Sequence, residues 1–323
     1  MPRLLLILLC FCATNVQADY SREYIDQQVT LHTQTPAGVN IAYQVIGSPA
    51  EPAVVLIMGL GASHALWGDA FVQGIRQAGY RVILLDNRDV GASSRFTAWG
   101  EPTLWWELLK NQLGFAVNAP YLLADMADDV IAVMDTLEIQ KAHIVGASMG
   151  GMIAQIVAAR YPQRTQSLVS IMSTTGAPHL PPPSGASADM LNGLADGDAA
   201  EAQITLMKAR GFYPEAIPRQ LLAIIKTGDR SMEVAGITAP TLVLHGADDT
   251  LLPPAHGEHT ATLIQGATLK IFTGMGHDLP EPVLPGLLSI LTQHLQAHGS
   301  LPPATAPLLK ADARPGSRSK IPA

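Results

Sequence analysis

Residues 144–152 read IVGASMGGM, and this junction decides the fold of the chain. The apolar run AHIV leads into it and is typical of a buried strand, whereas the following MIAQIVAAR has helical periodicity. Between the two stands the pattern Gly-x-Ser-x-Gly, formed by Gly146, Ser148 and Gly150. A turn needs only one glycine, so the pattern indicates a sharp strand–turn–helix junction built around a serine.

This setting is typical of a nucleophile elbow. A strained backbone lifts the serine hydroxyl clear of the turn, and the N-terminus of the helix favours a developing anion nearby. Side chains at Gly146 and Gly150 would collide with the neighbouring helix and strand. A purely structural glycine-rich turn is the alternative, but it leaves the serine unexplained, so we expect Ser148 to act as a nucleophile.

A serine hydroxyl is a weak nucleophile until a base takes its proton. Of the ten histidines, His277 stands in TGMGHDLP, just beyond the last expected strand, where a loop would carry it over the edge of the sheet. The acid that orients this base is expected in HGADDTLLPP, directly after the seventh strand. Asp248 and Asp249 are adjacent, so only one can face the histidine. We choose Asp249, at the apex of the turn, and keep Asp248 as the alternative.

Attack on a carbonyl group also needs donors for the resulting oxyanion. One donor is expected to be the backbone N–H of Met149, the residue after the nucleophile. The other is expected to be the N–H of Leu60 in LIMGLGAS, where Gly59 and Gly61 let the backbone approach closely. The alternative for this loop is a tight strand–helix turn without a catalytic role.

Other histidines receive structural interpretations. His245 ends a strand and is expected to pack in the core. His256 and His259 are three residues apart on an expected helix, but no third ligand stands nearby, so a solvated face is favoured over a metal site. The role of His64 stays open. No metal ion or organic cofactor is expected.

Short apolar runs alternate with longer helical segments along the chain, which predicts an α/β fold. Runs rich in Val, Ile and Leu suit a mostly parallel sheet covered by helices on both faces. We expect eight strands, the first two forming a hairpin, at residues 29–33, 40–47, 53–59, 80–86, 142–148, 167–173, 240–246 and 267–274.

Two stretches interrupt this alternation. Residues 96–121 are expected to add an inserted helix, and residues 175–237 a helical cap between strands six and seven. The hydrolase-like core is then expected in residues 19–174 and 238–297. The Pro-, Ala- and Ser-rich residues 298–323 are expected to be a disordered tail.

Composition narrows the range of functions. The chain has 323 residues, a net charge of -7 and 48% hydrophobic residues, enough for one large domain. A nucleic-acid binder is usually basic, with Lys and Arg gathered on one face, and no such stripe occurs. Nucleic acid is therefore not expected as a partner.

The first residues predict export. One arginine precedes an apolar run of about ten residues, too short for a membrane span, and VQA offers a cleavage site after Ala18. Residues 1–18 are therefore expected to be a signal peptide of a periplasmic or secreted protein; a membrane anchor and a lipoprotein signal are the alternatives. Both cysteines, Cys10 and Cys12, fall inside this segment, so the mature chain would lack thiols and disulfides.

These residues together resemble an α/β-hydrolase over residues 29–294. Within that superfamily, LIMGLGASHALWGDAF, VILLDNRDVGASSRF, YLLADMADDVIAVMDTLEI, HIVGASMGGMIAQIVAARYP and GMGHDLP resemble the aclacinomycin methylesterase-like carboxylesterases. The resemblance implies a serine esterase. It assigns the catalytic triad and the oxyanion donors to Ser148, Asp249, His277, Leu60 and Met149.

The chain departs from this pattern at two places. Met58–Gly59 stands where many hydrolases carry His-Gly, and the stretch around Trp99, Trp105 and Trp106 is long for the group. In DNRDVGASS, Asp86 and Arg88 are expected to hold their own loop.

The expected function is that of an exported serine hydrolase that cleaves a small-molecule ester with an apolar group through an acyl-enzyme. Apolar cap residues favour such a substrate, although any of them can equally form the core of the cap: Met190, Leu191, Leu206, Met207, Phe212 and Tyr213.

Alternatives on the same fold are a lipase or lysophospholipase, a C–C bond hydrolase, an acyltransferase and a perhydrolase. A non-enzymatic ligand receptor is the alternative of a different class. The Trp105–Trp106 pair could contact the substrate pocket or a membrane surface, and no oligomeric state is predicted.

Overall fold

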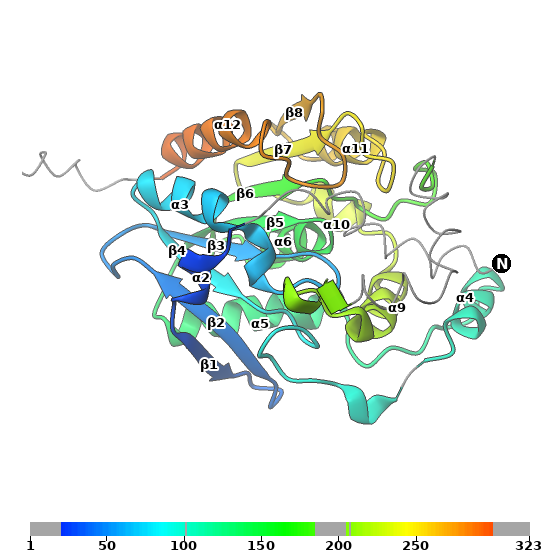
Figure 1. The fold of residues 1–323 in the computed structure, drawn as a ribbon. Helices are drawn as coiled ribbons and strands as arrows, with labels where there is room; N and C mark the ends of the chain where they lie inside the picture. Colours follow the sequence, from blue (N-terminus) through cyan, green and yellow to red (C-terminus); the bar gives the residue numbers. More distant parts are fainter. Residues whose placement is uncertain (1–20, 101, 185–204, 207, 300–323) are drawn as a thin grey trace, which may run out of the picture.

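The computed structural model describes residues 21–100, 102–184, 205–206 and 208–299. Its centre is an eight-stranded sheet of order β1-β2-β4-β3-β5-β6-β7-β8 (Figure 1). The strands are β1 (Thr30–Gln34), β2 (Asn40–Ile46), β3 (Ala53–Ile57), β4 (Arg81–Leu85), β5 (Ala142–Ala147), β6 (Thr165–Ile171), β7 (Thr241–Gly246) and β8 (Thr268–Phe272). Only the β1–β2 and β2–β4 pairs are antiparallel, which confirms the mostly parallel α/β-hydrolase sheet.

Helices cover both faces of this sheet. On one face α3 packs against α12, and on the other α5 packs against α6 (Figure 1). Strands β3, β4, β5 and β7 are buried along their whole length, as their continuous apolar sequences predict. The longer helices are α3 (Asp69–Gln77), α4 (Leu104–Gln112), α5 (Leu123–Thr136), α6 (Met149–Arg160), α9 (Ile217–Thr227), α11 (Ala255–Leu263) and α12 (Leu284–Ala297).

The segment after β3 differs from its prediction. Residues 65–79, ALWGDAFVQGIRQAG, have the pattern of a single helix ended by Gly79, but the structure contains a short 3₁₀ helix, η2 (His64–Trp67), followed by α3. Gly68 separates them with a φ of 71°, a left-handed conformation that favours glycine and ends the first helix. The break turns the backbone so that His64 packs inward beside the loop after β4.

That loop is held as predicted, by Asp86 and Arg88. The Arg88 guanidinium makes a bidentate ion pair with Asp129 of α5, with Nε–Oδ2 and Nη2–Oδ1 distances of 2.6 and 2.9 Å. The Asp86 carboxylate accepts the N–H groups of Ala92 and His64, each at 2.9 Å. Burial raises the pKa of Asp129 above its ordinary value, and the hydrogen bonds and charge of Arg88 oppose this shift.

The expected segments can be located only in part. The proposed signal peptide, residues 1–18, lies outside the described residues, as do all but the first two residues of the proposed tail. Of the cap, the described residues include η4 (Pro214–Ala216), α9 and α10 (Ser231–Ala235), between β6 and β7. The inserted segment after β4 contains η3 (Thr97–Trp99) and α4, which lies beside α9 (Figure 1).

We expect Gly146→Ala to destabilise the fold by about 3 kcal/mol, the upper end of the usual cost of overpacking, because the atoms it meets are rigid. A Cβ at Gly146 would lie 2.1 Å from the carbonyl oxygen of Gly150, and neither backbone can move aside. The control is Gly286→Ala on α12, whose Cβ would meet its nearest neighbour, Phe272, at 4.0 Å. Urea denaturation should show that the control is neutral or stabilised, and equal stability of the two variants would contradict this account.

Candidate active site

Ser148 occupies the turn between β5 and α6 with φ 55° and ψ −121°, a strained conformation for a residue with a side chain. The two glycines of the pattern make the turn possible. A Cβ at Gly150 would lie 2.0 Å from the carbonyl oxygen of Ile57 at the end of β3, and one at Gly146 would meet Gly150 itself. The close contact between α6 and β3 therefore requires glycine, as the sequence predicted.

Ser148, His277 and Asp249 lie in one hydrogen-bonded row. The Oγ atom of Ser148 is 2.9 Å from Nε2 of His277, and Nδ1 of His277 is 2.7 Å from Oδ2 of Asp249. The three residues come from the β5–α6 turn, the loop after β8 and the loop after β7, which meet at one edge of the sheet. This geometry allows Nε2 of the imidazole to take the serine proton while its Nδ1–H donates a hydrogen bond to the carboxylate, which stays charged.

Asp249 is held as an anion. Its side chain is buried, and Oδ1 accepts the backbone N–H groups of Leu251 and Leu252 at 3.0 and 2.8 Å. Burial by itself would raise the pKa of Asp249, but the charge of His277 and hydrogen bonds from His245, His277 and Leu252 outweigh it and hold the pKa well below its usual range. The charged carboxylate can therefore stabilise an imidazolium at His277.

Asp248, the alternative acid, points elsewhere. Its Oδ2 atom accepts the backbone N–H of Gly274 at 2.8 Å, so it braces the loop that leads to His277. His245 is buried, as expected, with Nε2 2.7 Å from the carbonyl oxygen of Leu252 and 3.4 Å from Oδ2 of Asp249. It thus supports the loop that presents Asp249.

The predicted oxyanion donors flank the serine. We define the oxyanion loop as residues 58–63; within it, a Cβ on Gly59 would lie 3.1 Å from Cβ of Ser148, so the loop backbone touches the nucleophile. Met149 is the first residue of α6, where the first amides of a helix have no intrahelical acceptor. Among the described residues, neither the Leu60 nor the Met149 amide donates to a backbone carbonyl. Both amides are therefore available to a ligand oxygen.

The other histidines considered from the sequence make structural hydrogen bonds. The Nδ1 atom of His64 lies 2.7 Å from Oδ1 of Asp86, which settles the role left open by the sequence. The solvated face expected for His256 is wrong, because α11 packs against the segment after β6: His256 is buried and contacts the Thr174 hydroxyl at 2.7 Å. His259 is half-buried and contacts the Thr175 hydroxyl at 3.1 Å. Within the part of the chain that the structure describes, no three His, Cys, Asp or Glu side chains are grouped to hold a metal ion.

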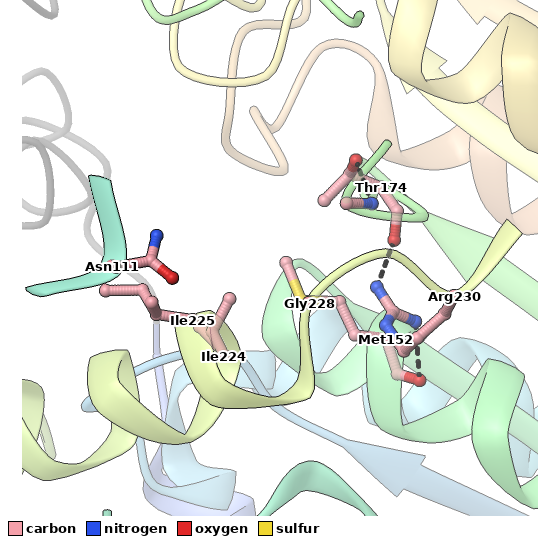
Figure 2. Close-up of a pocket in the computed structure, with 8 residues that line it drawn as sticks. Asn111, Met152, Thr174, Ile224, Ile225, Gly228 and Arg230 are labelled. Carbon is pink, nitrogen blue, oxygen red and sulfur yellow. Dashed lines mark hydrogen bonds between the residues drawn. The ribbon is translucent and has the colours of Figure 1, made fainter. Parts of the chain in front are cut away.

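A cavity of about 230 Å³ lies between α4, α9 and the segment after β6 (Figure 2). Its lining includes Met152, which stands four residues after Ser148 on α6, and Thr174, together with Ile224 and Ile225 on α9. Sequence reasoning missed this lining, because the segment after β6 and α9 are far apart in the sequence and both line the cavity only in the folded chain. Arg230 lies at the polar side, donating to the Thr174 carbonyl at 2.6 Å.

The apolar cap residues named from the sequence differ in their burial. Phe212 is fully buried against the oxyanion loop, and Leu206 is exposed. Met190, Leu191 and Met207 lie outside the described residues. No described helix is both long and apolar enough to cross a bilayer.

Comparison with known proteins places these features in a family. A family model described as "alpha/beta hydrolase fold" matches residues 52–203. Rhodomycin D methylesterase DnrP of Streptomyces peucetius is 29% identical, over 78% of this chain and 93% of its own length. A 2-hydroxy-6-oxononadienedioate/2-hydroxy-6-oxononatrienedioate hydrolase of Cupriavidus pinatubonensis is 30% identical, over 72% of this chain and 82% of its own.

A solved structure agrees with the fold. The enol-lactonase from Burkholderia xenovorans aligns with a TM-score of 0.62 and 21% identity, covering 82% of this chain and all of that one. At this identity the likeness supports the shared fold alone.

The two adjacent aspartates provide a matched test of the hydrogen-bonded row. We expect Asp249→Asn to lower kcat for an activated ester by about 10⁴-fold, because the amide no longer stabilises the imidazolium or its tautomer. Asp248→Asn removes the same charge one residue away and should change kcat by less than about fivefold. Steady-state kinetics with p-nitrophenyl acetate measures both, and a larger loss in the Asp248 variant would contradict the assignment.

Proposed function

This chain belongs to the α/β-hydrolase family, and on that premise we propose that it is a serine hydrolase that cleaves carboxylic esters. Ser148 is the nucleophile, His277 the base and Asp249 the acid that orients it. The observation that carries the proposal is the row of hydrogen bonds from the Ser148 hydroxyl through His277 to a buried, ionised Asp249, set on a strained elbow.

In the first half of the reaction, Oγ of Ser148 attacks the ester carbonyl carbon while Nε2 of His277 takes the hydroxyl proton. The negative charge moves to the carbonyl oxygen, where the N–H groups of Leu60 and Met149 stabilise it. When the tetrahedral intermediate collapses, the C–O bond to the alcohol breaks and His277 returns its proton to the leaving alkoxide. An acyl-enzyme on Ser148 remains.

The second half repeats these steps with water. His277 takes a proton from the attacking water, the same two amides stabilise the second oxyanion, and the proton returns to Ser148 as the acid leaves. Asp249 stays charged throughout and stabilises the imidazolium in both halves. These steps require no metal ion or organic cofactor.

A small ester with an apolar group is the proposed substrate. Met152, Ile224 and Ile225 supply an apolar lining to the cavity beside the elbow, so burial of a hydrocarbon part of the substrate is favourable. Similarity to a protein named rhodomycin D methylesterase supports an ester of a small alcohol. We further propose that residues 1–18 direct the enzyme to the periplasm or the outside of the cell, as their signal-like sequence suggests.

A second candidate, a lipase or lysophospholipase, is favoured by one feature of the surface. Four of the eight exposed large hydrophobic side chains in the described residues belong to η3, α4 and the loop that follows: Trp99, Trp106, Leu113 and Phe115. Exposed tryptophan and phenylalanine are typical of segments that insert into the surface of a lipid layer. This segment would bring the substrate cavity, which α4 lines through Asn111, to a lipid surface.

We expect Ser148→Ala to lose activity on p-nitrophenyl esters by several orders of magnitude, because removing the nucleophile leaves only binding and the oxyanion donors. His277→Ala should cause a similar loss, and the double variant should lose little more. Retained turnover in Ser148→Ala would rule out the proposed mechanism. A set of esters that varies acyl and alcohol size then identifies the preferred substrate.

The lipid-surface candidate has its own test. The double variant Leu113→Ser/Phe115→Ser should bind phosphatidylcholine vesicles at least about tenfold more weakly, since each buried apolar side chain contributes about 1.5–3 kcal/mol. Met232→Ser is the matched control, because Met232 is 94% exposed but stands on α10. Equal vesicle binding by the wild type and the double variant in a sedimentation assay would leave the soluble esterase as the better account.

A further inference from the structure

The oxyanion loop is anchored at its first residues by the core. The Asn87 amide donates to the Met58 carbonyl at 2.8 Å, from the loop after β4. Within the loop, the Ala62 N–H donates to the Gly59 carbonyl at 3.2 Å, a long hydrogen bond. The core thus fixes the start of the loop more firmly than its middle.

The cap holds the other end of the loop. Residues 211–213, which precede η4, lie alongside it: Phe212 forms an antiparallel bridge with Ala62, and the Tyr213 N–H donates to the Gly61 carbonyl at 2.6 Å. Gly61 has a φ of 68°, and a Cβ there would approach the Phe212 ring to 3.0 Å. Cap and oxyanion loop therefore pack through backbone contacts that a side chain at Gly61 would disturb.

One side chain completes this contact. Gln220 of α9 is fully buried, and its Oε1 atom accepts the Gly61 N–H at 2.7 Å. Its Nε2 atom donates to the Arg88 carbonyl, also at 2.7 Å. A backbone N–H can only donate and a carbonyl can only accept, so these partners determine which end of the amide faces which loop.

These contacts bear directly on the orientation of Leu60. Its N–H belongs to the Gly59–Leu60 peptide, whose carbonyl accepts the long bond from Ala62 and no other backbone N–H of the described residues. The next peptide carries the Gly61 N–H, and Gln220 holds it. Glycine stands on each side of Leu60, so the backbone there has a wider range of accessible dihedral angles than other residues would allow. An oxyanion donor must lie about 2.7–3.1 Å from the developing charge, so rotation of this segment would weaken it.

We propose that Gln220 is a positioning residue of the cap that fixes the Leu60 N–H for oxyanion stabilisation. The inference rests on the proposed esterase function and adds a role for the cap in the chemical step, beyond covering the substrate. A cap residue that sets an oxyanion donor acts on kcat, whereas a residue that only lines the substrate cavity acts mainly on KM.

Gln220→Met removes both hydrogen bonds at similar volume. We expect kcat for a p-nitrophenyl ester to fall about 10- to 100-fold with little change in KM, a part of the loss of about 10²–10³ caused by deleting a donor. The inhibition constant of a trifluoromethyl ketone, which forms a tetrahedral adduct with an oxyanion, should rise by the same factor. A reagent that modifies Ser148 without forming an oxyanion does not report on the positioning of the Leu60 N–H by Gln220.

The control is Leu222→Ala on the same helix. Leu222 is buried in a small apolar cluster with Val117 and Leu221, whereas the apolar residues of the oxyanion loop belong to the main core cluster. Its truncation should lower Tm at least as much as Gln220→Met does, yet leave kcat and the ketone inhibition constant within about twofold of wild type. The comparison separates loss of cap stability from loss of positioning.

Gln220→Glu gives the same test if the methionine variant does not fold. A protonated carboxyl can accept from Gly61 and donate to Arg88 as the amide does, but a carboxylate repels the Arg88 carbonyl. The kcat of this variant, divided by that of wild type at each pH, should therefore rise as the pH falls through the raised pKa of a buried glutamate.

Two results would overturn the role of Gln220: a kcat within about twofold of wild type in Gln220→Met, or equal losses of kcat in Gln220→Met and Leu222→Ala. If the wild-type protein itself hydrolyses no ester, the proposed function fails instead. The two failures are thus distinguishable.

Discussion

The close approach of α6 to the end of β3 is the constraint on which the site depends. Gly150 stands so near the Ile57 carbonyl that no side chain fits between them, and the helix begins there with Ser148 at a positive φ. Since β3 and β5 are neighbours in the sheet, this contact also brings the loop after β3 against the serine. Nucleophile and oxyanion loop are therefore placed together by a single packing contact.

The rest of the site follows from the order of the strands. β7 and β8 lie at one end of the parallel sheet, and their following loops present Asp249 and His277 at the edge where β5 presents Ser148. Residues more than a hundred positions apart in the chain meet because parallel strands end at a common edge. Asp248 and His245 then serve as supports, one for each loop.

Much of this arrangement could be predicted from the sequence, and the limits have physical causes. Apolar runs and the Gly-x-Ser-x-Gly pattern are local signals, so the sheet and Ser148 were predictable. Asp249 was separable from Asp248 only by its place in the turn. The break at Gly68, the pairing of His64 with Asp86 and the lining of the cavity depend on tertiary contacts. Gln220 is the clearest case: it bonds a residue 159 positions away, and nothing in its own segment marks it.

The central claim is that Ser148 is an activated nucleophile, and reaction of the purified protein with a fluorophosphonate tests it most directly. Mass spectrometry of the digested protein should locate a single adduct on Ser148, and the adduct should be absent after His277→Ala. That result would mean that the base activates the serine as the geometry indicates. No adduct at Ser148, or an adduct that forms equally without His277, would contradict the account and favour a ligand receptor built on a hydrolase fold.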